Sequence, residues 1–252
     1  MGLRDVGLLA DLGTLYHLAV KPVRGSSHAE RLESFYAGQA TQYDRFRQRL
    51  LQGRDELWDA LPTPSDGVWV DMGGGTGQNL EYLGDRIRSL RKVYLVDLCP
   101  SLLEVARRRI DRHGWTNVEV VEADVTTFRA GGEPVDVITF SYSLTMIPDW
   151  FTALGQAHSL LRAGGTIGVV DFYVSRQLPA AGRRRHGWWT RTLWPIWFAR
   201  DHVHLSPDHV PYLHARFDPV RFREHVARVP YLPLARVPYY TFIGRVGSPN
   251  PF

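Results

Sequence analysis

The chain has 252 residues, 44% apolar and 22% charged, which is ordinary for a globular protein that buries a core. No stretch approaches the roughly 18 apolar residues that a membrane span needs, which argues against a membrane-spanning class. A net charge of +4 and a pI of 9.3 favour an anionic partner, such as a lipid headgroup or a nucleic acid. The single cysteine, Cys99, excludes an internal disulfide and predicts a reducing, cytoplasmic compartment.

Residues 1–62 are predicted to form an N-terminal helical cover. Leu8, Leu12 and Leu15 recur at helical spacing, so residues 5–20 are expected to form an amphipathic helix. This helix can either dock on the core or lie on a membrane surface, and docking is the more ordinary outcome.

A second helical segment is predicted at about 28–60. It carries Tyr36 and Tyr43, which lie seven residues apart on one helical face, and it ends before Pro62. The two tyrosines are candidates to cover a bound cofactor, although core packing explains the same spacing.

A glycine-rich loop follows the first predicted strand. Residues 68–79 read V-W-V-D-M-G-G-G-T-G-Q-N, so an acid and three glycines stand at alternate positions: Asp71, Gly73, Gly75 and Gly77. Glycine lets a backbone approach a ligand closely, and a helix start offers free N–H groups. Gln78 occupies the third glycine position of the dinucleotide fingerprint, which argues against NAD. A ligand-free tight turn is the plain alternative.

The spacing D-x-G-x-G-x-G resembles motif I of the class I S-adenosylmethionine (SAM)-dependent methyltransferases. Short apolar runs alternate with helical ones from residue 63 to the end, which predicts an α/β domain over 63–252. Strands are expected at 68–72, 92–97, 118–122, 135–140 and 166–172, and helices at 77–89, 101–113 and 149–162. The resemblance implies a Rossmann-like, seven-stranded, mostly parallel sheet with helices on both faces and an insertion after strand five.

Acids at the next strand ends extend the predicted cofactor site. Asp97 ends the second strand twenty residues after Gly77, where a carboxylate can accept both hydrogen bonds of a ribose diol. Asp124 ends the third strand and can accept from an adenine amino group, while Val125 packs on the ring. Ser141, after strand four, is assigned to the same site. A phosphate ligand is disfavoured because no lysine follows the loop before residue 92.

Several longer blocks give a more specific resemblance. They read E-R-L-E-S-F-Y-A-G-Q-A-T-Q-Y-D-R-F-R (30–47), T-F-S-Y-S-L-T-M-I-P-D-W-F (139–151), G-V-V-D-F-Y-V-S-R (168–176), W-P-I-W-F-A-R-D-H-V-H-L-S-P-D-H-V-P-Y-L (194–213) and V-P-Y-L-P-L-A-R-V-P-Y-Y-T-F-I-G (229–244). The region 28–245 is similar to the methyltransferase of bacterial betaine-lipid synthesis, a diacylglyceryl-homoserine N-methyltransferase.

This resemblance implies three N-methylations of the amino-acid-headed lipid diacylglyceryl-homoserine, which give diacylglyceryl-trimethylhomoserine. Three SAM molecules become S-adenosylhomocysteine. A separate partner enzyme would transfer the homoserine group, and the protein would contact the inner face of the membrane peripherally.

An aromatic and basic insertion is predicted at about 176–218, followed by a closing antiparallel pair of strands near 230–246. Half of the chain's eight tryptophans, beginning with Trp188, fall within ten positions, with Arg191 among them. Tryptophan favours the headgroup level of a bilayer and arginine pairs with phosphate or carboxylate, so a membrane-facing lid is expected. A buried aromatic subcore is the alternative. Nucleic acid is not expected, because the basic residues form one short cluster without a long track.

The chemistry of amine methylation requires positioning and a proton acceptor. The candidate base is His209 or Asp171, and Tyr142, directly after strand four, is placed beside the transferred methyl group. Aromatic faces attract a quaternary ammonium, and the tyrosines expected near the acceptor are Tyr173, Tyr239 and Tyr240. No metal is expected, because His202, His204 and His209 have no firm fourth ligand.

Two other functions remain open. The acceptor can be a soluble amine or a quinone-like small molecule, in which case the protein should not bind liposomes. A SAM-binding regulatory or RNA-binding module would bind the cofactor without turnover.

Overall fold

The structure is a computed structural model that describes residues 50–200, 202–229 and 235–247, together with Glu30 and Glu33. The predicted helices at 5–20 and over most of 28–60 lie outside the described residues, as do Tyr36 and Tyr43. Within the described chain, no helix combines the length and the apolar character that crossing a bilayer requires.

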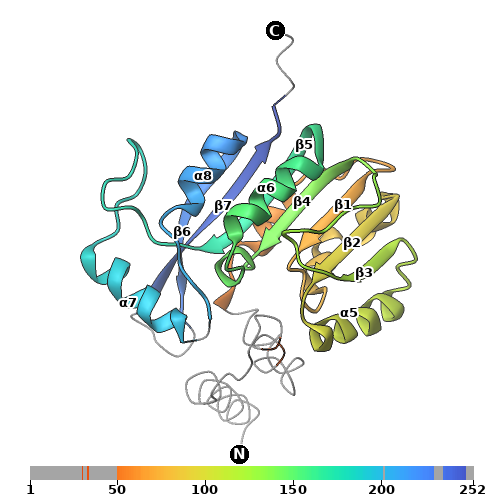
Figure 1. Ribbon diagram of the computed structural model, residues 1–252, viewed down its shortest axis with the longest axis horizontal. Coiled ribbons are helices and arrows are strands. Elements are labelled where there is room, and N and C mark those ends of the chain that lie inside the picture. The colour runs from red at the N-terminus through yellow and green to blue at the C-terminus, as the bar shows by residue number, and fades with distance from the viewer. Residues whose placement is uncertain (1–29, 31–32, 34–49, 201, 230–234, 248–252) are drawn as a thin grey trace, which may run out of the picture.

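A seven-stranded sheet forms the centre of the molecule, in the order β3-β2-β1-β4-β5-β7-β6 (Figure 1). The strands are β1 (Val68–Met72), β2 (Lys92–Asp97), β3 (Val118–Glu122), β4 (Val135–Ser141), β5 (Leu161–Phe172), β6 (Asp218–Arg228) and β7 (Arg236–Arg245). The first five are parallel, whereas β7 runs antiparallel to both β5 and β6. The chain order reverses between β1 and β4, so the carboxyl ends of these strands form the crevice where such sheets bind ligands.

Helices cover both faces of the sheet. The elements are α4 (Arg54–Ala60), the 3₁₀ helix η1 (Gln78–Ser89), α5 (Pro100–His113), the 3₁₀ turn η2 (Leu144–Met146), α6 (Trp150–Leu160), α7 (Trp188–Ala199) and α8 (His209–Arg216). One apolar cluster joins α4, η1 and α5 to the sheet, and a second joins α6 and α8 to the opposite face. Figure 1 shows α6 and α8 on the near face and α7 standing away from the sheet.

Local sequence explains where α5 begins and ends. Pro100 occupies the first turn, where its missing N–H costs nothing, and Gly114 caps the other end in the left-handed conformation (φ 62°). Leu103 and Ala106 are fully buried on one stripe of this helix against the sheet. The helix therefore holds the β2–α5 turn in place beside the glycine loop.

The predicted α/β fold with a seven-stranded, mostly parallel sheet is confirmed. Two details differ from the sequence-based expectation. Residues 78–89 form a 3₁₀ helix that kinks at Gly84 (φ 52°, ψ −135°), not a regular α-helix. The closing antiparallel pair was expected near 230–246, but its first strand, β6, already begins at Asp218.

Candidate active site

The glycine loop turns sharply from β1 toward η1. Gly73, Gly75 and Gly77 all have left-handed φ angles, of 73°, 56° and 71°. The N–H groups of Gly73 and Gly74 donate to the carbonyl of Val96 on β2, at 2.8 and 3.1 Å. A Cβ atom on Gly73 would lie 2.5 Å from the Ser143 Cβ, so the loop needs glycine both for its conformation and for its close approach.

Asp97 fastens this loop from the end of β2. Its Oδ2 accepts the N–H of Gly75 at 2.9 Å, and its Oδ1 accepts the N–H of Cys99 at 2.9 Å. Glu33 reaches the same place, because its carboxylate accepts the N–H of Ser101 and the Sγ–H of Cys99, both at 3.2 Å. Burial raises the pKa of the Cys99 thiol to about 12.

A buried polar network lies beneath the loop. Thr139 accepts from Trp69 Nε1 at 3.1 Å and donates to Asp71 Oδ1 at 2.8 Å. Asn79 donates to Asp71 Oδ2 at 3.5 Å and accepts from the Arg54 guanidinium at 3.2 Å. Desolvation raises the pKa of Asp71 to about 6, against the lowering effect of these hydrogen bonds. Asp71 is therefore fully buried in the hydrogen-bond network that supports the glycine loop.

Sequence reasoning missed Arg54, Asn79 and Thr139 as members of this network. Asn79 stands one position beyond the end of the D-x-G-x-G-x-G-x run, so its closeness to the motif could have indicated its place in the network. Arg54 precedes the loop by many residues in the chain, and only the folded structure places its guanidinium next to Asn79.

The next strand end carries Asp124 and Val125. Asp124 is exposed, and its Oδ1 accepts from the N–H and the Oγ1 of Thr126 at 2.8 and 2.7 Å, which forms an Asx turn. Val125 is buried against the sheet. The predicted adenine contacts of these residues stay predictions.

Strand β4 ends at Ser141, followed by Tyr142. The Ser141 hydroxyl is buried without a hydrogen-bond partner among the described residues. Tyr142 has a left-handed φ of 55°, which is unusual for an aromatic residue, and its hydroxyl donates to the Gln52 carbonyl at 2.6 Å. Backbone strain of this kind gathers at functional sites. The proposed role of Tyr142 beside the methyl group stays a prediction.

Asp171 is fully buried at the carboxyl end of β5. Its carboxylate accepts from the Thr145 N–H, the Thr145 hydroxyl and the Phe172 N–H at 3.1, 2.8 and 2.7 Å. Burial raises its pKa to about 7, although these hydrogen bonds oppose the shift. The carboxylate thus holds the η2 turn from inside the core.

His209 lies at the start of α8 with no exposed surface. Its ring packs edge-on against Trp150, with ring centroids 4.7 Å apart, and neither ring nitrogen has a hydrogen-bond partner among the described residues. Burial lowers its pKa to about 4, so the imidazole is neutral. This packing suits a core residue, and the predicted role as a base has no direct contact to support it.

The three candidate acceptor tyrosines separate in space. Tyr239 stacks on the His225 ring at 4.8 Å and belongs to the α4 face, whereas Tyr240 is fully buried in the α6–α8 face. Tyr173 donates its hydroxyl to Glu224 at 2.6 Å. The alternation of Tyr239 and Tyr240 along β7 follows the period of a strand.

Helix α7 divides its aromatic residues between two faces. Trp194 and Phe198 are buried, while a row of apolar side chains is exposed: Trp188 60%, Trp189 75%, Leu193 52%, Ile196 62% and Trp197 48%. Residues 176–200, called here the aromatic–basic segment, contain six arginines and no acidic residue. The rest of the chain then has 24 Lys and Arg against 26 Asp and Glu, so the segment carries the positive charge.

Residues 70–165 match the family model described as "Methyltransferase domain". The chain is 25% identical over 162 residues to the ubiquinone/menaquinone biosynthesis C-methyltransferase UbiE of Hahella chejuensis, which covers 62% of this chain. It is 26% identical to UbiE of Escherichia coli O1:K1 / APEC, also over 162 residues. The matches span 65% and 64% of the lengths of these two relatives.

Solved structures have the same fold. Phosphoethanolamine N-methyltransferase 2 of Haemonchus contortus, in complex with phosphomonomethylethanolamine and S-adenosylhomocysteine, aligns with a TM-score of 0.66 at 12% identity. The alignment covers 89% of this chain and 61% of the Haemonchus contortus chain. The N-methyltransferase NodS of Bradyrhizobium japonicum WM9 aligns with a TM-score of 0.54 at 14% identity, over 84% of this chain and 99% of its own.

Residues 70–165 thus resemble the methyltransferase-domain family, and the chain has the Rossmann-like fold of class I methyltransferases. The spacing of the glycine loop predicts SAM as the cofactor. The site fits a cationic sulfonium, because acids surround the loop and lysine is absent from it. The glycine positions leave room that a side chain would fill.

Proposed function

We propose that the chain methylates the amino group of an amino-acid-headed lipid at a membrane surface, with diacylglyceryl-homoserine as acceptor and its trimethylated betaine lipid as product. The observation that carries the lipid assignment is the exposed apolar face of α7 within a segment of six arginines and no acid. Tryptophan and arginine together suit the headgroup level of an anionic bilayer. The resemblance of five sequence blocks to the betaine-lipid methyltransferase supports the headgroup.

When bound on the glycine loop, SAM supplies a methyl group on a sulfonium that is open to in-line attack. Asp97 fixes the loop, and the network of Asp71, Thr139 and Asn79 keeps its support rigid. Positioning of this kind supplies much of the rate in methyl transfer. Asp171 is the proposed proton acceptor, because its pKa of about 7 matches the removal of a proton from an ammonium group near neutral pH.

A quinone-like ring is the second candidate acceptor. The relatives that match this chain are named as ubiquinone/menaquinone biosynthesis C-methyltransferases, which supports a ring carbon as the methylated atom. An amphiphilic acceptor of either kind would use the exposed face of α7 in the same way.

The test uses purified protein, SAM with a labelled methyl group and two vesicle preparations. One contains diacylglyceryl-homoserine and the other a quinone-type ring that lacks one methyl group. Labelled mono-, di- and trimethyl amino lipids in the first preparation are the expected result, with no label in the second. Label in the quinone alone would replace the amine by the ring carbon as acceptor. SAM binding without label in either preparation would overturn both assignments.

A further inference from the structure

A second pocket lies apart from the glycine loop. It has a volume of about 250 Å³ and opens between the segment after β5, helix α8 and strand β6. Leu178, Pro179, Val210 and Pro211 give it an apolar wall, and no glycine-loop residue lines it. The pocket belongs in part to the aromatic–basic segment, which contributes Leu178 at 81% exposure. An apolar chain can therefore pass from the pocket to the surface.

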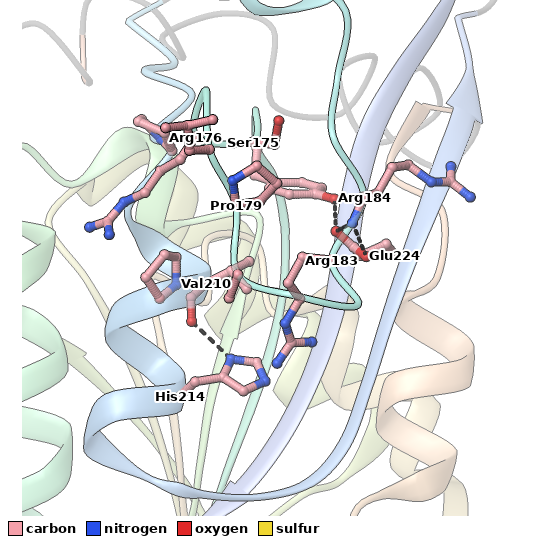
Figure 2. Close-up of a pocket in the computed structure, with 13 residues that line it drawn as sticks. Ser175, Arg176, Pro179, Arg183, Arg184, Val210, His214 and Glu224 are labelled. Carbon is pink, nitrogen blue, oxygen red and sulfur yellow. Dashed lines mark hydrogen bonds between the residues drawn. The ribbon is translucent and has the colours of Figure 1, made fainter.

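Arg183 supplies the positive charge of this pocket. Its guanidinium carbon lies 4.1 Å from the centroid of the Phe222 ring. Figure 2 shows the guanidinium turned toward the His214 ring, whereas the neighbouring Arg184 side chain extends away. Within the described chain, no carboxylate oxygen lies within 4.0 Å of the Arg183 guanidinium. The stacked ring fixes the plane of the guanidinium and leaves its N–H donors for a ligand.

The acids nearest to the pocket are already engaged. Glu224 accepts from the Tyr173 hydroxyl at 2.6 Å and from the Arg184 N–H at 3.0 Å. Asp208 accepts from Arg176 Nε at 2.6 Å. The guanidinium of Arg183 is thus available to an incoming anion, beside an acid whose lone pairs are partly satisfied by other donors.

We infer that this pocket binds the carboxylate or phosphate of an amphiphile, with Arg183 holding the anion and the proline-containing wall holding the start of the apolar chain. A guanidinium pairs with either anion in a two-pronged geometry. The inference goes beyond the proposed function, because it does not depend on which atom is methylated. The anion can belong to the acceptor itself or to a neighbouring membrane lipid.

The test is calorimetric titration of the purified protein with decyl phosphate, decanoate and neutral decyl glucoside, each below its critical micelle concentration. Inorganic phosphate is titrated in the same way. Decyl phosphate and decanoate are expected to bind one to one. Arg183→Gln should weaken this binding about tenfold, and Ala180→Trp should abolish it by filling the pocket. Two exposed neighbours outside the pocket provide matched controls, and Arg185→Gln and Ala181→Trp should bind as wild type does.

Equal binding of decyl glucoside or of inorganic phosphate alone would overturn the inference, as would wild-type binding by Ala180→Trp. If Arg183→Gln fails to fold, Ala180→Trp and its control decide. The methylation assay then separates the sources of the anion. If Arg183→Gln raises the KM for the acceptor in phosphatidylcholine vesicles, the anion belongs to the acceptor. If Arg183→Gln raises this KM only in vesicles that contain phosphatidylglycerol, the anion belongs to a neighbouring lipid. Binding of decyl phosphate without methyl transfer would leave the pocket assigned and overturn only the proposed function.

Discussion

The Gly75 N–H donates to Asp97 Oδ2 at 2.9 Å, and this hydrogen bond ties the loop after β1 to the end of β2. The same carboxylate also accepts the Cys99 N–H through Oδ1. Its two oxygens therefore fix two backbone turns at the crevice where the cofactor is expected.

Asp97→Asn should weaken SAM binding by at least about tenfold. The amide keeps the shape of the carboxylate but faces one of the two N–H groups with its own NH₂, so one charge-assisted hydrogen bond is lost. Calorimetric titration with SAM measures the change. The exposed Asp124→Asn is the comparison, and equal losses for the two variants would contradict a special role for Asp97.

Gly73→Ala should abolish SAM binding while the protein still folds. A Cβ at this position would meet the Ser143 Cβ at 2.5 Å, so the loop must shift. Gly132→Ala is the matched control, because Gly132 also has a left-handed φ, of 85°, but has nothing within 4 Å of its Cβ position. The control should lose only about 1 kcal/mol of stability and keep SAM affinity. Similar SAM binding by both variants would show that close packing of the loop is not required.

The exposed face of α7 should carry membrane binding. Trp189→Ala with Leu193→Ala removes two side chains that are 75% and 52% exposed, so the fold should keep its stability. Sedimentation with phosphatidylglycerol vesicles should show about tenfold weaker binding, because two apolar side chains no longer enter the interface. Phe151→Ala, at 56% exposure on α6, removes an exposed aromatic residue elsewhere and should bind as wild type does. An equal loss in the control would contradict docking through α7.

His209 should lower stability as the pH falls. Its folded pKa of about 4 lies below the ordinary value of 6.5, so between these values the unfolded chain takes up a proton that the folded chain does not. The free energy of unfolding should therefore fall by on the order of 2 kcal/mol more in wild type than in His209→Gln between pH 7 and pH 5. Urea denaturation at both pH values measures this.

The pH dependence of stability is compared between wild type and His209→Gln because a second buried group, Asp171, also changes stability with pH. Asp171 has a raised pKa of about 7, so its contribution is present below its unfolded value and is lost as the pH rises through about 7, the opposite direction. Both proteins contain Asp171, so its effect cancels. His113→Gln on the exposed end of α5 is a control, and a pH dependence in His209→Gln that equals wild type would refute the assignment.

Much of the sheet could be predicted from the sequence, because its first five strands are short apolar runs bounded by turns. Strand β6 was missed at its start, since Asp218–Arg228 mixes charged and apolar residues and has little buried surface. Its pairing with β7 supplies what its own pattern lacks. Likewise η1 has the apolar spacing of an α-helix, but the left-handed Gly84 interrupts it.

The candidate cofactor site could be predicted from the sequence because its residues lie at strand ends or in one loop. Arg54 was not, since nothing in the sequence near it indicates contact with Asn79, 25 residues away. His209 is a residue for which the sequence suggested a chemical role that its position in the structure does not support. A histidine in a polar stretch suggested chemistry, and the structure places it without exposed surface against Trp150. Sequence spacing reports backbone neighbours well and side-chain burial poorly.

We propose methyl transfer from SAM to the amine of a lipid headgroup. It is tested most directly by mass spectrometry of lipids extracted from a host that expresses this chain together with a supplier of diacylglyceryl-homoserine. We expect diacylglyceryl-trimethylhomoserine to accumulate with the wild-type chain and to fall sharply with Asp97→Asn. Unmethylated diacylglyceryl-homoserine alone, in cells that contain folded wild-type protein able to bind SAM, would contradict it.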